Sequence, residues 1–399
     1  MQKKIIALAL AGLASSAAFA QSNVTLYGRA DYGYMVRGDD DGAVSKNLKN
    51  KSEFASGIGA GSRIGFKGSE DLGNGLKAIF EIEYGLSLDS SGGGAAAGQA
   101  NGAGTSTTWW NRHSYVGLSS ASLGTVVGGR LDGVRYGIFN KYDAFAGGNI
   151  GNFTQMTGQV DRANNAIAYI SPSFSGFNAV LAYSSSIGNS NNLGLAAQEG
   201  GAATGRDSAT VPSAATLGGN AGDATLYTAN LNYTNGGLSL SADYEYINFY
   251  GGNVDSAYTA AKGHDDAQVY LFAGSYDFGV VKVAALYDRF ETSTNSWGRA
   301  AGLGDADIQS WFISASAPLG KFLVKATYGE TENDNVQDSK GTKFGLGLDY
   351  NLSKRTKIYT GYAIISNENK AAYQLNPAAN SYGAGYGVQG FDLGVAHTF

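Results

Sequence analysis

The spacing between the strand-like segments of this chain is the feature that most constrains its fold. Segments of about ten residues with alternating apolar and polar side chains recur along the chain, separated by stretches rich in glycine, serine and asparagine. The connections between these segments are alternately long and short, and 70–73, 119–122 and 352–354 are examples of the short ones. An up-and-down β-barrel with long loops at one end and tight turns at the other has this alternation. A soluble β-sandwich does not require it.

The pattern predicts an all-β fold with sixteen antiparallel strands. We expect the strands at residues 23–37, 58–69, 74–88, 108–119, 123–131, 161–171, 176–187, 223–234, 237–249, 265–277, 280–292, 306–317, 320–332, 341–351, 355–367 and 387–399. Pro172 and Pro318 then fall in short turns, where a missing N–H removes no ladder hydrogen bond. Sixteen strands enclose a space too wide for side chains to fill, so the barrel holds an aqueous channel.

Each predicted strand has one face suited to lipid and one suited to water. In the third strand, Glu81 and Glu83 lie opposite Phe80 and Ile82. In the last strand, one face carries Phe391, Leu393, Val395, His397 and Phe399, and the other carries Asp392, Gly394, Ala396 and Thr398. We therefore expect a wall that separates lipid from a wet lumen.

The first twenty residues have the layout of a secretory signal peptide. Lys3 and Lys4 precede the apolar run 5–13, and a small-residue cleavage site follows at 18–20. A transmembrane helix is disfavoured here because the apolar run is too short to span a bilayer. We expect residues 1–20 to be removed, which leaves 21–399 as a single transmembrane β-barrel domain.

Several short motifs occur in order from one end of the chain to the other. They are VTLYG at 24–28, SRIGFKGSEDLGNG at 62–75, RHSYVGL at 112–118, GTVVGGR at 124–130, SPSFSGF at 171–177, YNLSKRT at 350–356 and GVAHTF at 394–399. In these motifs the chain resembles the Gram-negative general-diffusion porins, in particular their trimeric proteobacterial branch.

The resemblance implies a setting and partners for the chain. It implies a homotrimer in the outer membrane of a Gram-negative bacterium, surrounded by outer-membrane lipid and lipopolysaccharide. It also implies that the third external loop, 131–160, bends into the lumen as a constriction. The terminal Phe399 would be the signal that the barrel-assembly machinery recognises.

Strand phasing places four arginines on the inner wall. Arg29 and Arg162 alternate with lipid-facing neighbours, and so does Arg63. Arg112 is placed inward, on the face opposite His113 and Tyr115. The resemblance implies the same arrangement, because basic residues on the first, second, fourth and sixth strands form the basic side of the constriction in that family. A fifth candidate at the end of the fifth strand is Arg130.

Two acids of the third loop are candidates for the opposing side of the constriction. They are Asp132 and Asp143. This loop has YDAF at 142–145 where the family commonly has a Pro-Glu-Phe sequence, so which acid faces the arginines stays open. A row of charges at a narrow point selects ions. The excess of basic candidates predicts a weak anion preference, although Glu81 and Glu83 could reverse it. The alternative is that the arginines only pair with acids in solvent.

The leading functional prediction is a channel for passive diffusion of small ions and hydrophilic solutes. One alternative is a substrate-specific channel for sugars or organic acids, which needs a track of aromatic side chains or a dedicated binding site. Another is an adhesin or receptor that the barrel only anchors. The long loops 89–107 and 188–222 are low-complexity stretches without aromatic anchors, which argues against a tight protein interface.

The sequence gives little support to catalysis or to cofactor binding. The chain has no cysteine, which excludes thiol catalysis and cysteine-based zinc sites. A serine–histidine site would need a serine and a third group beside His113, His264 or His397. Residues 39–41 and 264–266 are acidic stretches, and such stretches in loops are more often solvated than bound to a cation. We expect no catalytic residue, no metal site and no cofactor, and the net charge of −5 argues against a nucleic-acid partner.

Overall fold

A computed structural model describes most of the barrel. The described residues are 23–39, 51–89, 112–146, 148, 150–157, 159–187, 225–248, 266–293, 307–371, 373, 375 and 387–399. The expected signal peptide at 1–20 lies outside these ranges, as do His264 and almost all of the loops 89–107 and 188–222. Residues 40–41 and 264–265 of the two acidic stretches lie outside them too.

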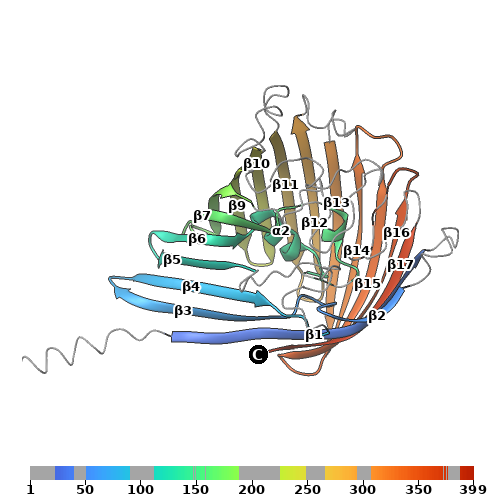
Figure 1. Ribbon diagram of the computed structural model, residues 1–399, viewed down its shortest axis with the longest axis horizontal. Helices are drawn as coiled ribbons and strands as arrows, with labels where there is room; N and C mark the ends of the chain where they lie inside the picture. Colours follow the sequence, from blue (N-terminus) through green and yellow to red (C-terminus); the bar gives the residue numbers. More distant parts are fainter. Residues whose placement is uncertain are drawn as a thin grey trace, which may run out of the picture.

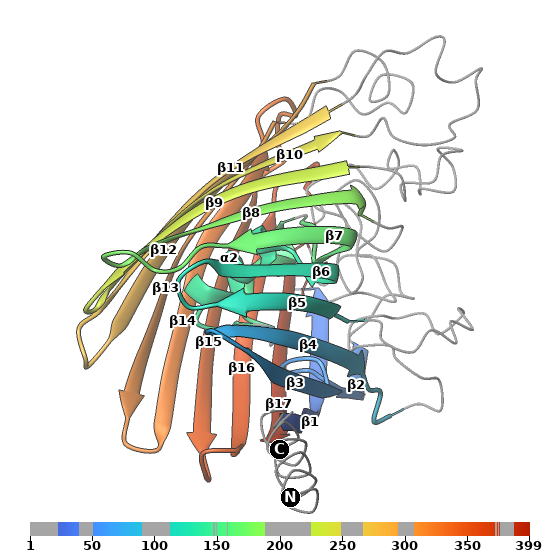
Figure 2. The ribbon, with the colours of Figure 1, turned by 90° about the vertical axis from the view of Figure 1, so that its left-hand side faces the viewer.

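The described strands form one antiparallel sheet that closes on itself as a barrel (Figures 1 and 2). They are β1 (Asn23–Asp39), β2 (Lys51–Ser56), β3 (Arg63–Gly73), β4 (Leu76–Gly85), β5 (Ser114–Ser120), β6 (Gly124–Asp132), β7 (Arg162–Ile170), β8 (Phe177–Ser186), β9 (Thr225–Asn235), β10 (Leu238–Asn248), β11 (Asp266–Asp277), β12 (Lys282–Ser293), β13 (Asp307–Leu319), β14 (Phe322–Asn333), β15 (Gly341–Asn351), β16 (Thr356–Asn367) and β17 (Val388–Thr398). The pairing of β1 with β17 closes the ring. Because β2 and β3 are parts of one interrupted strand, the predicted sixteen-stranded barrel is confirmed.

The interruption of the second strand differs from the prediction. β1 pairs with β3 up to Arg29 and with β2 from Tyr32 onward, and residues 57–62 leave the ladder between them. Gly57 has a φ of 74°, a left-handed conformation that glycine adopts without strain. The predicted strand 58–69 is therefore wrong at its start, because its first five residues belong to the interruption.

The short turns explain how neighbouring strands reverse so tightly. Asn74, Gly236, Gly279 and Gly320 all have φ between 53° and 83°, in the left-handed region that tight turns need. Pro318 differs slightly from the prediction, because it lies in the last part of β13 and pairs with Leu323 instead of lying in the turn.

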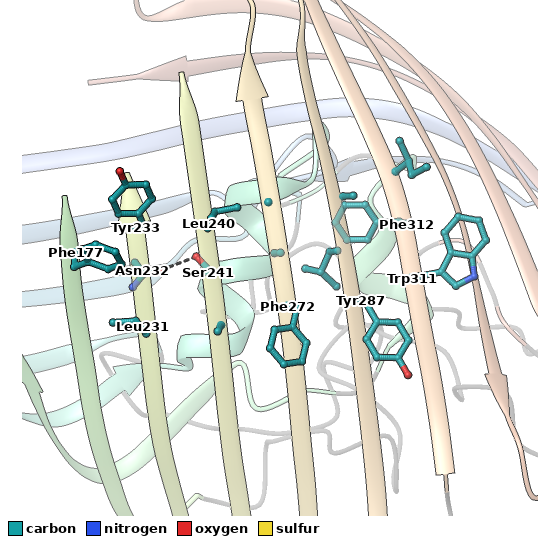
Figure 3. Close-up of a pocket in the computed structure, with 16 residues that line it drawn as sticks. Phe177, Leu231, Asn232, Tyr233, Leu240, Ser241, Phe272, Tyr287, Trp311 and Phe312 are labelled. Atoms are coloured by element: carbon teal, nitrogen blue, oxygen red, sulfur yellow. Dashed lines mark hydrogen bonds between the residues drawn. The ribbon is translucent and has the colours of Figure 1, made fainter. Parts of the chain in front are cut away.

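The outer face of the barrel is apolar. On β17, Phe391, Leu393 and Val395 are between 44% and 48% exposed, whereas Asp392 between them is fully buried inside. Figure 3 shows a depression in this outer face, where Phe272 and other large side chains of β8–β13 stand around small residues of β10–β12. Its lining is almost wholly apolar, so it is a feature of the lipid-facing surface and not of the lumen.

The loop between β6 and β7 lies inside the barrel. It contains the helices α2 (Val134–Tyr142) and η1 (Phe153–Met156), and Figure 2 shows α2 enclosed by the strands. Within the described ranges, no helix is long and apolar enough to cross a membrane. The prediction that the third loop folds into the lumen is confirmed, and this loop narrows the channel.

Candidate functional site

The first half of the lumenal loop is fastened to β12 and β13. The guanidinium of Arg135 donates to both carboxylate oxygens of Asp288, from Nε at 2.7 Å and from Nη2 at 2.5 Å. Both side chains are buried, with exposed fractions of 2% and 1%. Phe139 packs against Phe312 of β13 with 6.0 Å between the ring centroids. An ion pair and an aromatic contact thus hold α2 against this side of the wall.

Asp143 organises the loop from within. Its Oδ1 accepts a hydrogen bond from the N–H of Phe145 at 2.9 Å, and its Oδ2 accepts one from the N–H of Phe153 at 2.6 Å. The hydroxyl of Thr327 on β14 donates to Oδ1 at 3.2 Å. Burial raises the pKa of this carboxyl, although the hydrogen bonds act against the rise. Asp143, expected on the acidic side of the constriction, is 4% exposed and directed into the loop and the wall.

The second half of the loop is fastened to β15 and β17. The ammonium of Lys343 donates to Oε1 of Gln155 at 2.7 Å and to the carbonyl of Asn152. The N–H of Ile150 donates to Oδ2 of Asp392 at 3.1 Å. Charged side chains of several strands therefore satisfy backbone groups of the loop, which fixes its path inside the barrel.

Three of the predicted arginines gather on the opposite part of the wall, formed by β1, β3 and the residues before β5. Nη2 of Arg29 lies 2.6 Å from Oδ2 of Asp31. Glu83 of β4 lies between the other two, because its Oε2 is 3.3 Å from Nε of Arg63 and its Oε1 accepts a hydrogen bond from Nε of Arg112. Arg63 is close enough to Arg29 and Arg112 for the like charges to repel one another.

The remaining two predicted arginines extend this basic wall toward β7. Nε of Arg162 lies 3.0 Å from Oδ1 of Asp132. Arg130 donates from Nε to the carbonyl of Arg112 at 3.1 Å and from Nη1 to Oδ1 of Asn164. The structure thus brings all five arginines to one region. It also places Asp132, expected on the opposing side, among the arginines themselves.

A β-bulge explains why Arg112 and its neighbour share this wall. The N–H of Glu83 donates to the carbonyl of His113 at 2.9 Å, and the N–H of Arg112 donates to the carbonyl of Glu83 at 3.3 Å. Arg112 and His113 thus both lie opposite Glu83, so their consecutive side chains point to the same side of the sheet. His113 lies 3.4 Å from Glu81, and Tyr115 donates to the same carboxylate at 2.7 Å. The prediction that His113 and Tyr115 face outward is wrong, because it assumed unbroken alternation.

The lumenal loop approaches the basic wall through Tyr136 of α2. Burial raises the pKa of its phenol, and the charges of Asp161, Arg162, Arg112 and Asp132 also act on it. Tyr136 in turn acts electrostatically on the guanidinium of Arg63. Tyr136 therefore lies within electrostatic reach of the basic wall.

Lys141 is a functional candidate that the sequence reasoning missed. Its side chain is exposed and its ammonium lies 3.5 Å from the hydroxyl of Ser241 on β10, whereas Ile138, Phe139 and Tyr142 are buried against the wall. The helical spacing of those three residues was the signal that could have placed Lys141 at the flank of the buried face. Because Asp143 is the only acid in 133–160, this loop presents a positive charge to the lumen.

These features define a class of protein. A closed barrel with an apolar outer face, a polar lumen and a charged loop inside it is a transmembrane channel. The chain matches the family model of the Gram-negative porins over residues 7–370 and belongs to that family. It is an outer-membrane porin, whose water-filled channel admits small hydrophilic solutes by passive diffusion.

Individual relatives are similar along the whole chain. Outer membrane porin protein 32 of Delftia acidovorans is 31% identical, with complete coverage of both chains. An outer membrane porin of Bordetella pertussis is 30% identical, and the alignment covers 90% of this chain and 93% of the relative. Among solved structures, the anion-selective porin from Comamonas acidovorans has 26% sequence identity and a TM-score of 0.71, with coverage of 95% of this chain and 100% of the other.

Proposed function

We propose that the constriction selects solutes by charge and favours small anions. The observation that carries this proposal is the excess of basic over acidic side chains around it. The basic ones are Arg29, Arg63, Arg112, Arg130, Arg162 and Lys141. The acids among them are Asp31, Glu81, Glu83, Asp132 and Asp161, so the basic side chains remain in excess. The similarity to a porin described as anion-selective supports the same conclusion.

The arrangement of these charges supports a physical mechanism. The arginines are held by ion pairs or, for Arg130, by hydrogen bonds, so their positive charges have fixed positions and need no rearrangement when an anion passes. Lys141 on α2 adds a positive charge from the side of the loop. A narrow, water-filled passage with this excess charge attracts anions and repels cations, and its width excludes large solutes.

Reversal potentials in planar bilayers test the proposal. Under a KCl gradient, the purified porin should show a potential displaced toward that of chloride. A double variant Arg63→Gln and Arg112→Gln should shift it toward that of potassium, because two positive charges are lost from the constriction. Lys354→Gln, in the exposed turn between β15 and β16, is a matched control that should change nothing. An unshifted potential in the double variant would refute the role of these arginines.

We further infer that the porin works as a homotrimer, surrounded by outer-membrane lipid and lipopolysaccharide, and that Phe399 is its assembly signal. The N–H of Phe399 donates to the carbonyl of Gly28 at 3.1 Å, and the reverse bond is 3.0 Å long, so the terminal residue reaches the first strand. Channel steps that appear in groups of three support a trimer. Phe399→Ala should lower the amount of folded porin in the outer membrane, and an undiminished amount would contradict the inference.

The proposed mature chain consists of residues 21–399 as one barrel domain and acts without catalysis. The layout of residues 1–20 supports their removal as a signal peptide. The mass of the intact protein purified from outer membranes tests this directly. Removal should leave a chain that begins at Gln21.

A further inference from the structure

Asp31 lies where β1 changes its pairing partner. β1 pairs with β3 up to Arg29 and with β2 from Tyr32 onward, so on this side no strand pairs with Asp31, although β17 pairs with it on the other side through Ala396. Its N–H donates instead to the hydroxyl of Ser62 at 3.0 Å, and its carbonyl accepts from the N–H of Gly57 at 2.7 Å. The interruption at 57–62 therefore folds over Asp31 and shields it completely, since its exposed fraction is 0%.

Both oxygens of the Asp31 carboxylate are bonded. Oδ1 accepts hydrogen bonds from the hydroxyl of Tyr359 at 2.7 Å and from the N–H of Gly59 at 3.0 Å. Oδ2 accepts from Nη2 of Arg29 at 2.6 Å and from Nε at 3.2 Å. Two donors from other elements thus hold the carboxylate still while it holds the guanidinium.

The surroundings of Tyr359 are built to keep its hydroxyl at this place. The ring is 1% exposed and comes from β16, on the other side of the barrel seam. A Cβ at Gly394 would lie 2.3 Å from its hydroxyl, and one at Gly33 would lie 3.2 Å from it. The absence of side chains at these two glycines makes room for the phenol beside Asp31.

Arg29 differs from its neighbours in how its charge is compensated. Arg63 and Arg112 share the single carboxylate of Glu83, whereas Arg29 has Asp31 as its own partner. Arg29 is 13% exposed, so part of its guanidinium reaches the lumen while its partner does not. A substitution of Asp31 therefore alters both the orientation of the Arg29 guanidinium and the net charge of the Arg29–Asp31 pair.

We propose that Asp31 is a positioning residue that holds Arg29 in place and offsets its charge, and thereby sets the strength of the anion preference. The inference rests on the proposed function and extends it to a residue that touches no solute. It predicts that Arg29 and Asp31 act as a unit in the selectivity of the channel.

Three variants and their combination test the proposal through the reversal potential. Asp31→Asn keeps the size of the side chain and removes its charge. It should raise the ratio of anion to cation permeability about twofold at physiological ionic strength, because one unit charge about 8 Å from the ion path, weakened by salt, acts in opposite directions on anions and cations. Arg29→Gln should lower the ratio. Asp31→Asn in the Arg29→Gln background should have a different effect, because only the charge of Asp31 is then lost and no guanidinium is released.

Arg29→Lys separates positioning from net charge. It keeps the positive charge but replaces the planar guanidinium, which bonds Oδ2 through two nitrogens, by a flexible ammonium. Positioning predicts a shifted reversal potential at unchanged net charge. This variant changes no fully buried residue, so it also serves if Asp31→Asn does not assemble. Heat-modifiable mobility on gels reports whether each variant has folded.

The outcomes distinguish this inference from the proposed function. If the unaltered porin has no anion preference, and the Arg63 and Arg112 variants do not change it, the proposed function fails. If those results are as expected but Arg29→Lys leaves the potential unchanged, only the positioning role is overturned. The same holds if Asp31→Asn has equal effects with and without Arg29.

Discussion

Arg135 of α2 and Asp288 of β12 form a buried, two-bonded ion pair that joins the lumenal loop to the barrel wall. The charges of Glu245 and Asp243 on β10 also act on Arg135. One guanidinium therefore compensates several carboxylates beneath α2. Such a pair is costly to break from one side, because the remaining charges are buried without compensation.

Replacement of Arg135 by methionine should therefore release α2 and destabilise the barrel. We expect a loss of roughly 3–5 kcal/mol, as for other buried pairs that lose one partner. The midpoint temperature of heat-modifiable gel mobility should fall, and single-channel currents should become larger and noisier. Arg289→Gln is the matched control, because Arg289 lies on the same strand as Asp288 but is exposed. Equal midpoints for the two variants would argue against the role of Arg135.

Lys141→Gln should weaken the anion preference without altering the basic wall. The side chain is exposed, its contact with Ser241 of β10 is a long hydrogen bond of 3.5 Å, and Arg135 and Phe139 anchor the helix. We expect a shift of the reversal potential toward that of potassium, smaller than that of the Arg63 and Arg112 double variant. The folded fraction should not change. A potential equal to that of the unaltered porin would mean that Lys141 lies outside the path of the ions.

Asp143→Asn tests whether Asp143 stabilises the loop or takes part in ion selectivity. The carboxylate accepts hydrogen bonds from two N–H groups, and an asparagine amide would turn a donor toward one of them. We expect a loss of about 1–3 kcal/mol in stability, the cost of an unsatisfied buried group. Ion selectivity should stay nearly constant because the charge is buried in the loop. A strong shift in reversal potential would instead assign Asp143 to the ion path.

Gly394→Ala should destabilise the seam between the first and last strands. A Cβ there would lie 2.3 Å from the hydroxyl of Tyr359, and this phenol is packed too tightly to move freely. Overpacking of this kind costs about 1–3 kcal/mol. Gly128→Ala is the control, because its Cβ would meet its nearest neighbour at 3.7 Å. The first variant should melt at a lower temperature than the second, and equal melting would refute the predicted clash.

Much of the barrel could be predicted because alternation and turn spacing are local properties. The predicted strand 341–351 coincides with β15, for example. Alternation failed where the backbone leaves regular pairing. In 57–62, glycines alternate with Ile58 and Ala60 as they would in a strand, yet these residues leave the ladder. The bulge at Arg112 shifted the phase of the following residues in the same way.

The path of the lumenal loop could not be predicted from local patterns. The position of Asp143 depends on Thr327, and that of Ile150 depends on Asp392, so both follow from contacts between residues far apart in the sequence. The arginines were easier to place because strands determine their direction. Their partners were not, since the pairing of Arg63 and Arg112 through Glu83 requires the register of three strands.

The channel has two parts that different residues encode. The loop is anchored on β12–β17, and the arginines cluster between β1 and β7. The aperture is set by one continuous insertion, and most of the charge by scattered positions on strands and at their ends, to which Lys141 of the loop is an addition. Substitutions among these arginines leave the contacts that anchor the loop unchanged. Descendants of such a barrel can therefore change the ions they admit while they keep the same size limit, or change the limit while they keep the same ions.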